Sequence, residues 1–137
     1  MKKPFAILGL LALSVVTSAC ALRDAQMFTD DTAELFATRN PQIKSCYDQA
    51  LVSDSAAAGT VAVSFQVEKK TGNIINPQIV PERTTAPEPV GMCVVNALQG
   101  LVLEPPDKND GQGVFTWEFV VNPPVQAAAP AEPAPAG

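Results

Sequence analysis

The sequence predicts a small α+β domain with two layers, in which helices cover one face of a three-stranded antiparallel sheet. Two observations predict this fold class. Apolar residues recur every three or four positions over residues 40–52 and 85–101, which is the period of an amphipathic helix. Over residues 61–67 and 114–121 they alternate with polar residues, as in strands with one buried face. A short leading helix is expected before these elements, whose own order is α-β-β-α-β.

The first two helices are predicted from their starting residues. Asp31 and Glu34 have capping-box spacing, which predicts a short helix over residues 30–36. Asn40 followed by Pro41 indicates an N-cap and a first helical position, and therefore a second helix over residues 40–52. The apolar face expected for this helix comprises Ile43, Cys46, Tyr47, Ala50 and Leu51.

Two strands are expected next. Residues 61–67 form the first strand, with a buried face made of Val61, Val63, Phe65 and Val67. Residues 69–73 supply a turn, in which Gly72 is free to adopt a positive φ, and residues 74–80 return as the second strand. Pro77 lacks a backbone N–H, so we expect this strand at an edge of the sheet.

A third helix and a third strand complete the predicted domain. Thr85 and Glu88 again have capping-box spacing, and the apolar face of this helix comprises Val90, Cys93, Val94, Ala97, Leu98 and Leu101. The last strand, residues 114–121, has an expected buried face of Phe115, Trp117, Phe119 and Val121. A right-handed crossover places it beside the first strand. The strand order is then second, first, third, and the third strand is an edge.

The N-terminus has the three-part layout of an export signal. Two lysines follow Met1, residues 5–16 carry no charge, and small residues lead to Cys20. The apolar run is shorter than the ~20 residues of a membrane-spanning helix, so residues 1–19 are interpreted as a signal peptide. Small residues before a cysteine resemble the bacterial lipobox, in which the cysteine is acylated and becomes the first mature residue. Cys20 is therefore the predicted lipidation site.

Lipidation and soluble secretion remain alternatives at this site. Ala19-Cys20-Ala21 also fits ordinary signal peptidase, and cleavage after Ala21 would release a soluble protein. If Cys20 is lipidated, Ala21 rather than Asp at the next position favours the outer membrane by analogy with enteric lipoprotein sorting, and the lipid anchors the protein to that membrane. Residues 20–37 are then a lipidated segment with a short helix, and about ten residues separate Cys20 from that helix.

Charge and composition limit the remaining possibilities. Removal of residues 1–19, which carry two lysines and no acid, takes the formal net charge from −5 to −7. An acidic domain without basic clusters is a poor nucleic-acid binder. Residues 38–122 are long enough for one small domain. Residues 123–137 are mostly Pro and Ala, which is typical of a disordered tail.

Cys46 and Cys93 are predicted to form a disulfide. Each lies on the apolar face of a helix, and an exported protein meets an oxidising compartment. The chain has no histidine to activate a thiol, no C-x-x-C, and too few soft ligands for zinc, so no metal or cofactor is expected. The alternative is two unpaired buried cysteines that act as small apolar side chains.

An enzymatic function is not expected from this sequence. Without histidine, catalysis would depend on carboxylates at the ends of predicted helices and in turns. Acidic residues at such positions usually serve as soluble turn formers. No catalytic residue is therefore assigned to the carboxylates considered: Asp48, Asp54, Glu82, Asp107 and Asp110.

Several segments together resemble a known family. They are PQIKSCY at residues 41–47 followed by Leu51, GTVAVSFQV at 59–67, GNI at 72–74, Cys93, and WEF at 117–119. This pattern resembles the AgmX/PglI C-terminal domain, which is similar to the C-terminal domain of TonB energy transducers. The resemblance covers about residues 38–122. It implies the same helices and three-stranded sheet, and docking of a partner peptide along an exposed strand.

The function expected from these observations is non-enzymatic binding in the cell envelope. An envelope protein or peptide would pair with the edge of the last strand, at Val114, Thr116, Glu118 and Val120. Trp117 alternates with Phe115 and Phe119 and is expected in the core. Two alternatives remain: a structural lipoprotein whose edge is covered by its own tail or N-terminal segment, and a soluble secreted binding or inhibitor protein.

Overall fold

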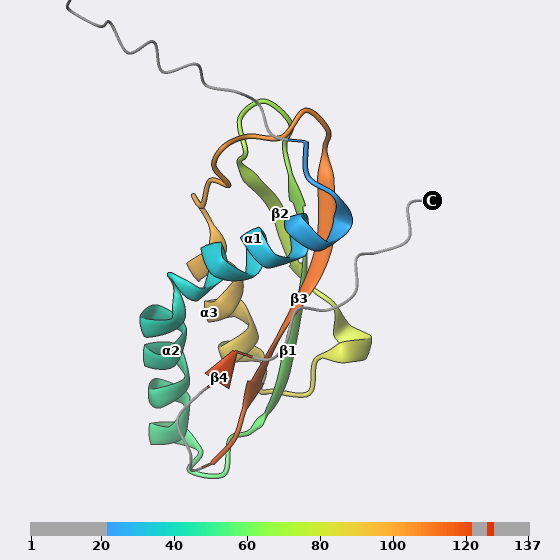
Figure 1. Ribbon diagram of the computed structural model, residues 1–137. Helices are drawn as coiled ribbons and strands as arrows, with labels where there is room; N and C mark the ends of the chain where they lie inside the picture. The colour runs from blue at the N-terminus through green and yellow to red at the C-terminus, as the bar shows by residue number, and fades with distance from the viewer. Residues whose placement is uncertain (1–21, 122–125, 128–137) are drawn as a thin grey trace, which may run out of the picture.

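The computed structural model describes residues 22–121 and 126–127, and Figure 1 shows its elements. Its helices are α1 (Ala25–Ala37), α2 (Asn40–Ser53) and α3 (Glu88–Leu98), with one 3-10 turn, η1 (Pro81–Arg83). Its strands are β1 (Gly59–Val67), β2 (Ile74–Ile79), β3 (Gly111–Phe119) and the two-residue β4 (Gln126–Ala127). The predicted α+β class is confirmed. The signal segment, Cys20 and the rest of the tail lie outside the described residues.

The sheet is antiparallel, with strand order β2-β1-β3-β4. β1 lies in the centre and pairs with β3 along its whole length, from Gly59↔Phe119 to Val67↔Gly111. β2 is an edge strand, as Pro77 predicted. The predicted order of the first three strands is confirmed. The prediction that the third strand is a free edge is wrong over part of its length, because β4 pairs with it at Trp117 and Glu118.

One hydrophobic core lies between the sheet and the helices, which occupy one side of it (Figure 1). Phe36 of α1 is fully buried and makes edge-to-face contacts with Phe65 and Phe115, with ring centroids 4.8 and 5.4 Å apart. Trp117 is also fully buried, as predicted. Because α1 supplies the central aromatic ring, the folded unit begins before the predicted boundary at residue 38.

The first helix starts earlier than its capping-box spacing predicted. Asp24 is the N-cap, and its Oδ1 accepts a hydrogen bond from the backbone N–H of Met27 at 2.8 Å. Asp31 and Glu34 lie well inside the helix, so the predicted capping box there is wrong. The physical reason is that an aspartate placed one residue before the helix satisfies a free N–H, whereas N–H groups inside a helix already have partners.

The starts of the other two helices also differ from prediction. α2 begins at Asn40 after Arg39, so Asn40 is not the N-cap. α3 begins at Glu88, and no side chain caps it. Thr85 does not form the predicted capping box because its hydroxyl accepts a hydrogen bond from the backbone N–H of Thr60 at 2.9 Å. The helix ends at Leu98, and Gly100 follows with φ +78°.

The last strand starts and ends earlier than predicted. It ends at Phe119, and Val121 is 44% exposed, so Val121 is not part of the buried face. It begins at Gly111, three residues before the predicted start. A Cβ at Gly111 would lie 2.3 Å from the Phe28 ring and would clash with it. Glycine at this position therefore leaves room for the ring to pack against the sheet. None of the helices in residues 22–121 is long and apolar enough to cross a membrane.

Candidate functional site

The outer edge of β3 is the side that faces away from β1. The hydrogen bonds of β1 show which residues of β3 direct their backbone groups to that side. The backbone oxygens of Thr60 and Ala62 accept from the N–H groups of Thr85 and Val80, both at 2.8 Å. These two residues of β1 therefore direct their backbone groups away from β3. Because the backbone groups of successive strand residues point to opposite sides, Val61 and the alternate residues after it direct theirs toward β3.

The register carries this alternation into β3. Val61 pairs with Trp117 and Val63 with Phe115, so the odd-numbered residues of β3 form the hydrogen bonds to β1. The residues between them turn their N–H and C=O groups to the outer edge: Gln112, Val114, Thr116 and Glu118. Three of the four predicted edge residues are in this set. The fourth, Val120, lies one residue beyond the end of β3.

Strand β4 occupies a short part of this outer edge. It pairs antiparallel with β3 through Trp117↔Ala127 and Glu118↔Gln126. Among residues 22–121 and 126–127, no strand pairs with the outer side of Val114 or Thr116. The tail therefore covers the end of the edge at Glu118. The middle of the edge, at Val114 and Thr116, presents backbone groups without a strand partner in the described part of the chain.

The sheet face beside this edge, opposite the helices, is rich in amides and hydroxyls. A shallow hollow of about 370 Å³ is lined by Ser64, Phe65, Gln66, Asn76, Gln78, Gln112, Gly113 and Val114. The Asn76 amide donates to Gln66 Oε1 at 3.1 Å. Thr116 Oγ1 is buried without a hydrogen-bond partner in the described structure. Glu118 is exposed on this face, opposite Thr60. A strand added at the edge would lay half of its side chains beside this polar surface.

The helices on the other face are joined by the predicted disulfide, which is confirmed. Cys46 of α2 and Cys93 of α3 are bonded, with their Cα atoms 5.9 Å apart. Both cysteines are half-buried and line a hollow of about 320 Å³ between the two helices. The Tyr47 hydroxyl donates to the backbone oxygen of Ala57, which lines the same hollow, at 2.7 Å. This side of the domain is therefore fixed covalently.

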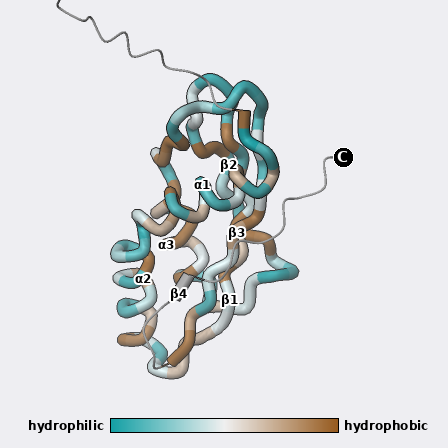
Figure 2. Tube along the Cα trace, viewed as in Figure 1, coloured by the Kyte–Doolittle hydropathy of each residue, from teal (hydrophilic) through white to brown (hydrophobic). Residues whose placement is uncertain are grey.

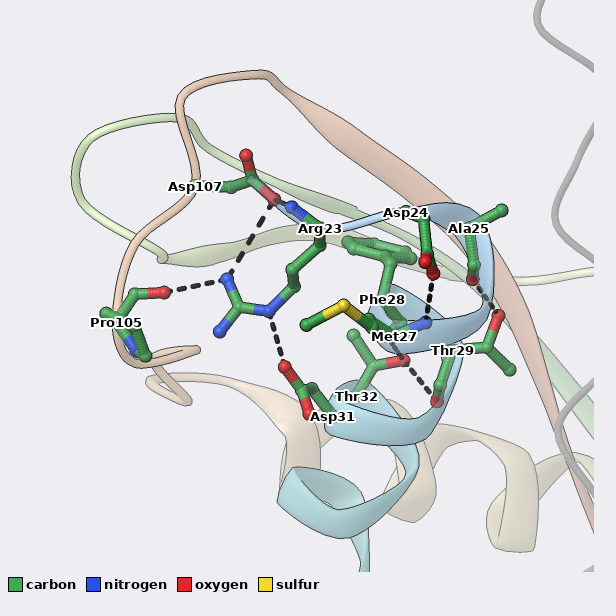
Figure 3. Close-up of polar contacts among 10 residues, drawn as sticks. All are labelled: Arg23, Asp24, Ala25, Met27, Phe28, Thr29, Asp31, Thr32, Pro105 and Asp107. Atoms are coloured by element: carbon green, nitrogen blue, oxygen red, sulfur yellow. Dashed lines mark hydrogen bonds and ion pairs between the residues drawn. The ribbon is translucent and has the colours of Figure 1, made fainter. Parts of the chain in front are cut away.

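Arg23 forms a polar cluster that the sequence did not predict (Figure 3). Its side chain is 2% exposed. Nε donates to Asp31 at 2.5 Å, and Nη1 donates to the backbone oxygen of Pro105 at 2.7 Å. Nη1 also lies 3.9 Å from an Asp107 oxygen, which accepts from the Arg23 backbone N–H at 3.2 Å. The cluster attaches the N-terminal segment to α1 and to the loop before β3.

Four of the five carboxylates that the sequence offered for catalysis each have a different polar partner. Asp107 pairs with Arg23, whereas Asp110 accepts from the backbone N–H of Lys69 at 2.9 Å. Asp48 pairs with Lys44 on the surface of α2 at 2.6 Å. Asp54 follows α2 and accepts from a backbone N–H two residues later. In the described residues, no group of three His, Cys, Asp or Glu side chains could hold a metal ion.

Fold and site together define a small disulfide-bridged α+β domain whose sheet edge at β3 is only partly paired within the described residues. Comparison of the chain with protein-family models, with curated proteins and with solved structures finds no match. The functional argument therefore depends on the geometry of the site and on the sequence.

Proposed function

We propose that this protein is a non-enzymatic cell-envelope lipoprotein that binds a partner by strand addition at the outer edge of β3. One observation carries the proposal: this edge already accepts a strand, because β4 pairs with it in antiparallel register at Trp117 and Glu118. In the same proposal the domain is a relative of the AgmX/PglI and TonB C-terminal domains. The strand order β2-β1-β3 and the helices on one face support that assignment.

The chemistry of strand addition fits the residues at this edge. Main-chain hydrogen bonds supply affinity, and alternate side chains supply specificity. Val114 and Thr116 direct their backbone groups outward, and their side chains lie on the sheet face away from the helices. A partner segment in extended conformation would extend the sheet along these positions and displace or continue β4. An envelope protein or peptide is the proposed partner.

The proposed anchor is a lipid on Cys20, and the proposed location is the outer membrane. The signal-like segment ending at residue 19 supports export, and the small residues before Cys20 support acylation. Burial of acyl chains contributes about 0.8 kcal/mol per CH₂, and stable anchoring requires two chains or a second membrane signal. Two acyl chains on the Cys20 thioether would meet that requirement without a membrane-spanning helix.

A proline at position 116 tests strand addition directly. Thr116→Pro removes one outward N–H and leaves the β1–β3 hydrogen bonds of its neighbours in place, so we expect the sheet to form. Loss of one hydrogen bond and a steric block should lower capture of the partner from envelope extract by about tenfold. The measurement is quantitative pull-down of the protein that the wild-type domain captures.

The matched control for this experiment is Thr116→Val. It keeps the backbone N–H and the side-chain shape and removes a hydroxyl that is buried without a partner in the described structure. We expect unchanged capture and a free energy of unfolding within about 0.5 kcal/mol of the wild type, or higher, since no hydrogen bond is lost. Equal capture by folded proline and valine variants would refute strand addition at this edge.

Removal of the tail tests whether β4 competes with the partner. A chain that ends at Val121 lacks β4, so the outward groups of Glu118 become available. We expect the truncated protein to capture the same partner several-fold better, since nothing has to be displaced. Binding isotherms of the full-length and truncated proteins measure the difference. A loss of capture after truncation would assign the binding activity to the tail instead of the edge.

A further inference from the structure

The folded unit starts very close to the proposed lipidation site. Arg23 is only three residues after Cys20, and its side chain is 2% exposed and held by α1 and the loop before β3. The sequence had predicted about ten residues between Cys20 and the first helix. The polar contacts of Arg23 therefore leave a much shorter tether than the sequence alone indicated.

The short tether limits the distance between the domain and the membrane. A fully extended chain spans at most about 3.6 Å per residue, so the Cα of Arg23 can lie no more than about 11 Å from that of Cys20. An acylated cysteine lies at the level of the lipid head groups, whose layer is about 5 to 8 Å thick on each side of the bilayer. Arg23 must therefore lie within or directly above the head groups.

Three segments form the end of the molecule at which Arg23 lies, and we name this end the anchor pole: Arg23, residues 68–73 and residues 104–110. They are joined by hydrogen bonds that backbone N–H groups donate. Arg23 N–H donates to the Asp107 side chain, Lys70 N–H donates to the Asp107 backbone oxygen at 3.0 Å, and Lys69 N–H donates to Asp110. Figure 1 shows the three segments at one end, and Figure 2 shows that its loops are largely hydrophilic.

The surface of the anchor pole carries charges of both signs, because Glu68, Glu104 and Asp110 are exposed on the same two loops as three lysines. Lys69, Lys70 and Lys108 are exposed on its two loops. Leu22, directly before Arg23, is 66% exposed, and Met27 in the first turns of α1 is 49% exposed. Lysine side chains reach phosphate groups with a charged end on an apolar stem, and isolated apolar side chains enter the head-group boundary.

We infer that the short tether set by Arg23 holds the anchor pole against a phospholipid surface and turns the far half of β3 away from it. This inference rests on the proposed acylation of Cys20. β3 starts at the pole and rises about 3.3 Å per residue, so Glu118 lies about 23 Å along the strand from Gly111 and up to that much further from the membrane. The proposed partner edge is then accessible while the pole is covered.

Lysine labelling of the acylated full-length protein tests this orientation. The protein is reconstituted into vesicles of phosphatidylcholine and phosphatidylglycerol, treated with a membrane-impermeant amine reagent and analysed by mass spectrometry. The reference is the soluble chain that begins at Leu22. We expect anchoring to lower the labelling of Lys69, Lys70 and Lys108 several-fold and to leave Lys44 of α2 unchanged. Lys44 is a matched control, because it and Lys69 are both 53% exposed and each pairs with an aspartate.

A second variant separates the tether from other causes of protection. Insertion of 15 Gly and Ser residues between Ala21 and Leu22 keeps the lipidation signal and the Arg23 contacts, and adds a flexible reach of about 20 Å. We expect this variant to regain the labelling of the soluble chain. Protection that persists despite the linker would overturn the role of the short tether.

The remaining outcomes distinguish this inference from the proposed function. An intact mass without acyl chains would overturn both the anchor and the orientation. An acylated protein in which Lys44 and Lys69 are labelled equally in vesicles would overturn the orientation alone and leave strand binding at β3 as proposed.

Discussion

Replacement of Cys46 and Cys93 by alanine is expected to lower the free energy of unfolding by about 4 kcal/mol. The disulfide closes a loop with a sequence separation of 47 that contains β1, β2 and part of both linked helices. Opening this loop increases the conformational freedom of the unfolded chain. Small domains commonly have only ~3–5 kcal/mol from their core, so the variant should be largely unfolded at 37 °C. Denaturant titration followed by the fluorescence of Trp117 measures the change.

Reduction of the wild-type protein provides the control for this prediction. Both cysteines are half-buried, so their replacement by alanine removes little packing, and the reduced wild type should match the double variant. A loss of less than about 1 kcal/mol in both samples would contradict the prediction, because it would mean that packing between α2 and α3 suffices to fix the helices.

Arg23→Ala is expected to lower the free energy of unfolding by about 3 kcal/mol, since removal of one partner leaves a buried charge uncompensated. Asp107 is 7% exposed. Without the Arg23 side chain it would lose its ion pair and keep only the hydrogen bonds from the backbone N–H groups of residue 23 and Asn109. The Pro105 oxygen would lose its donor. The contact with Asp31 should contribute less, because that carboxylate is 39% exposed. Urea titration of the soluble chain measures the effect.

Two further variants test the cause of this loss. Arg83→Ala removes an exposed arginine of η1 and should change stability by no more than about 0.5 kcal/mol. Addition of Asp107→Ala to Arg23→Ala should recover part of the loss, because the unpaired buried charge is then absent. A double variant no more stable than Arg23→Ala would show that the buried charge is not the reason.

The strands could be predicted from local periodicity, and the disulfide from the same periodicity together with the expected oxidising compartment. Alternation of apolar and polar residues assigned Phe65 and Trp117 to one face, and that face is buried. The same reasoning placed Cys46 and Cys93 on the apolar faces of two helices, and the two helices pack together. These features depend on the sequence within a few turns or one strand, which is the range over which a pattern is informative.

Other features depend on contacts between distant residues. Arg23 binds Pro105 and Asp107, which are 82 and 84 residues away, and no local pattern marks an arginine as buried. Thr85 has the spacing of a helix cap, but the Thr85 hydroxyl accepts a hydrogen bond from the backbone N–H of Thr60 in β1 instead. The pairing of β4 lies in a Pro- and Ala-rich tail, whose composition favours disorder.

The intact mass of the purified native protein, with and without reductant, tests the central claim most directly. The claim is that a disulfide-stabilised binding domain is held at the membrane through Cys20. We predict a mass for a chain that begins at Cys20 with two or three acyl chains, and a gain of two hydrogen atoms on reduction. An unmodified chain that begins at Leu22 would contradict the anchor and favour a soluble secreted binding or inhibitor protein.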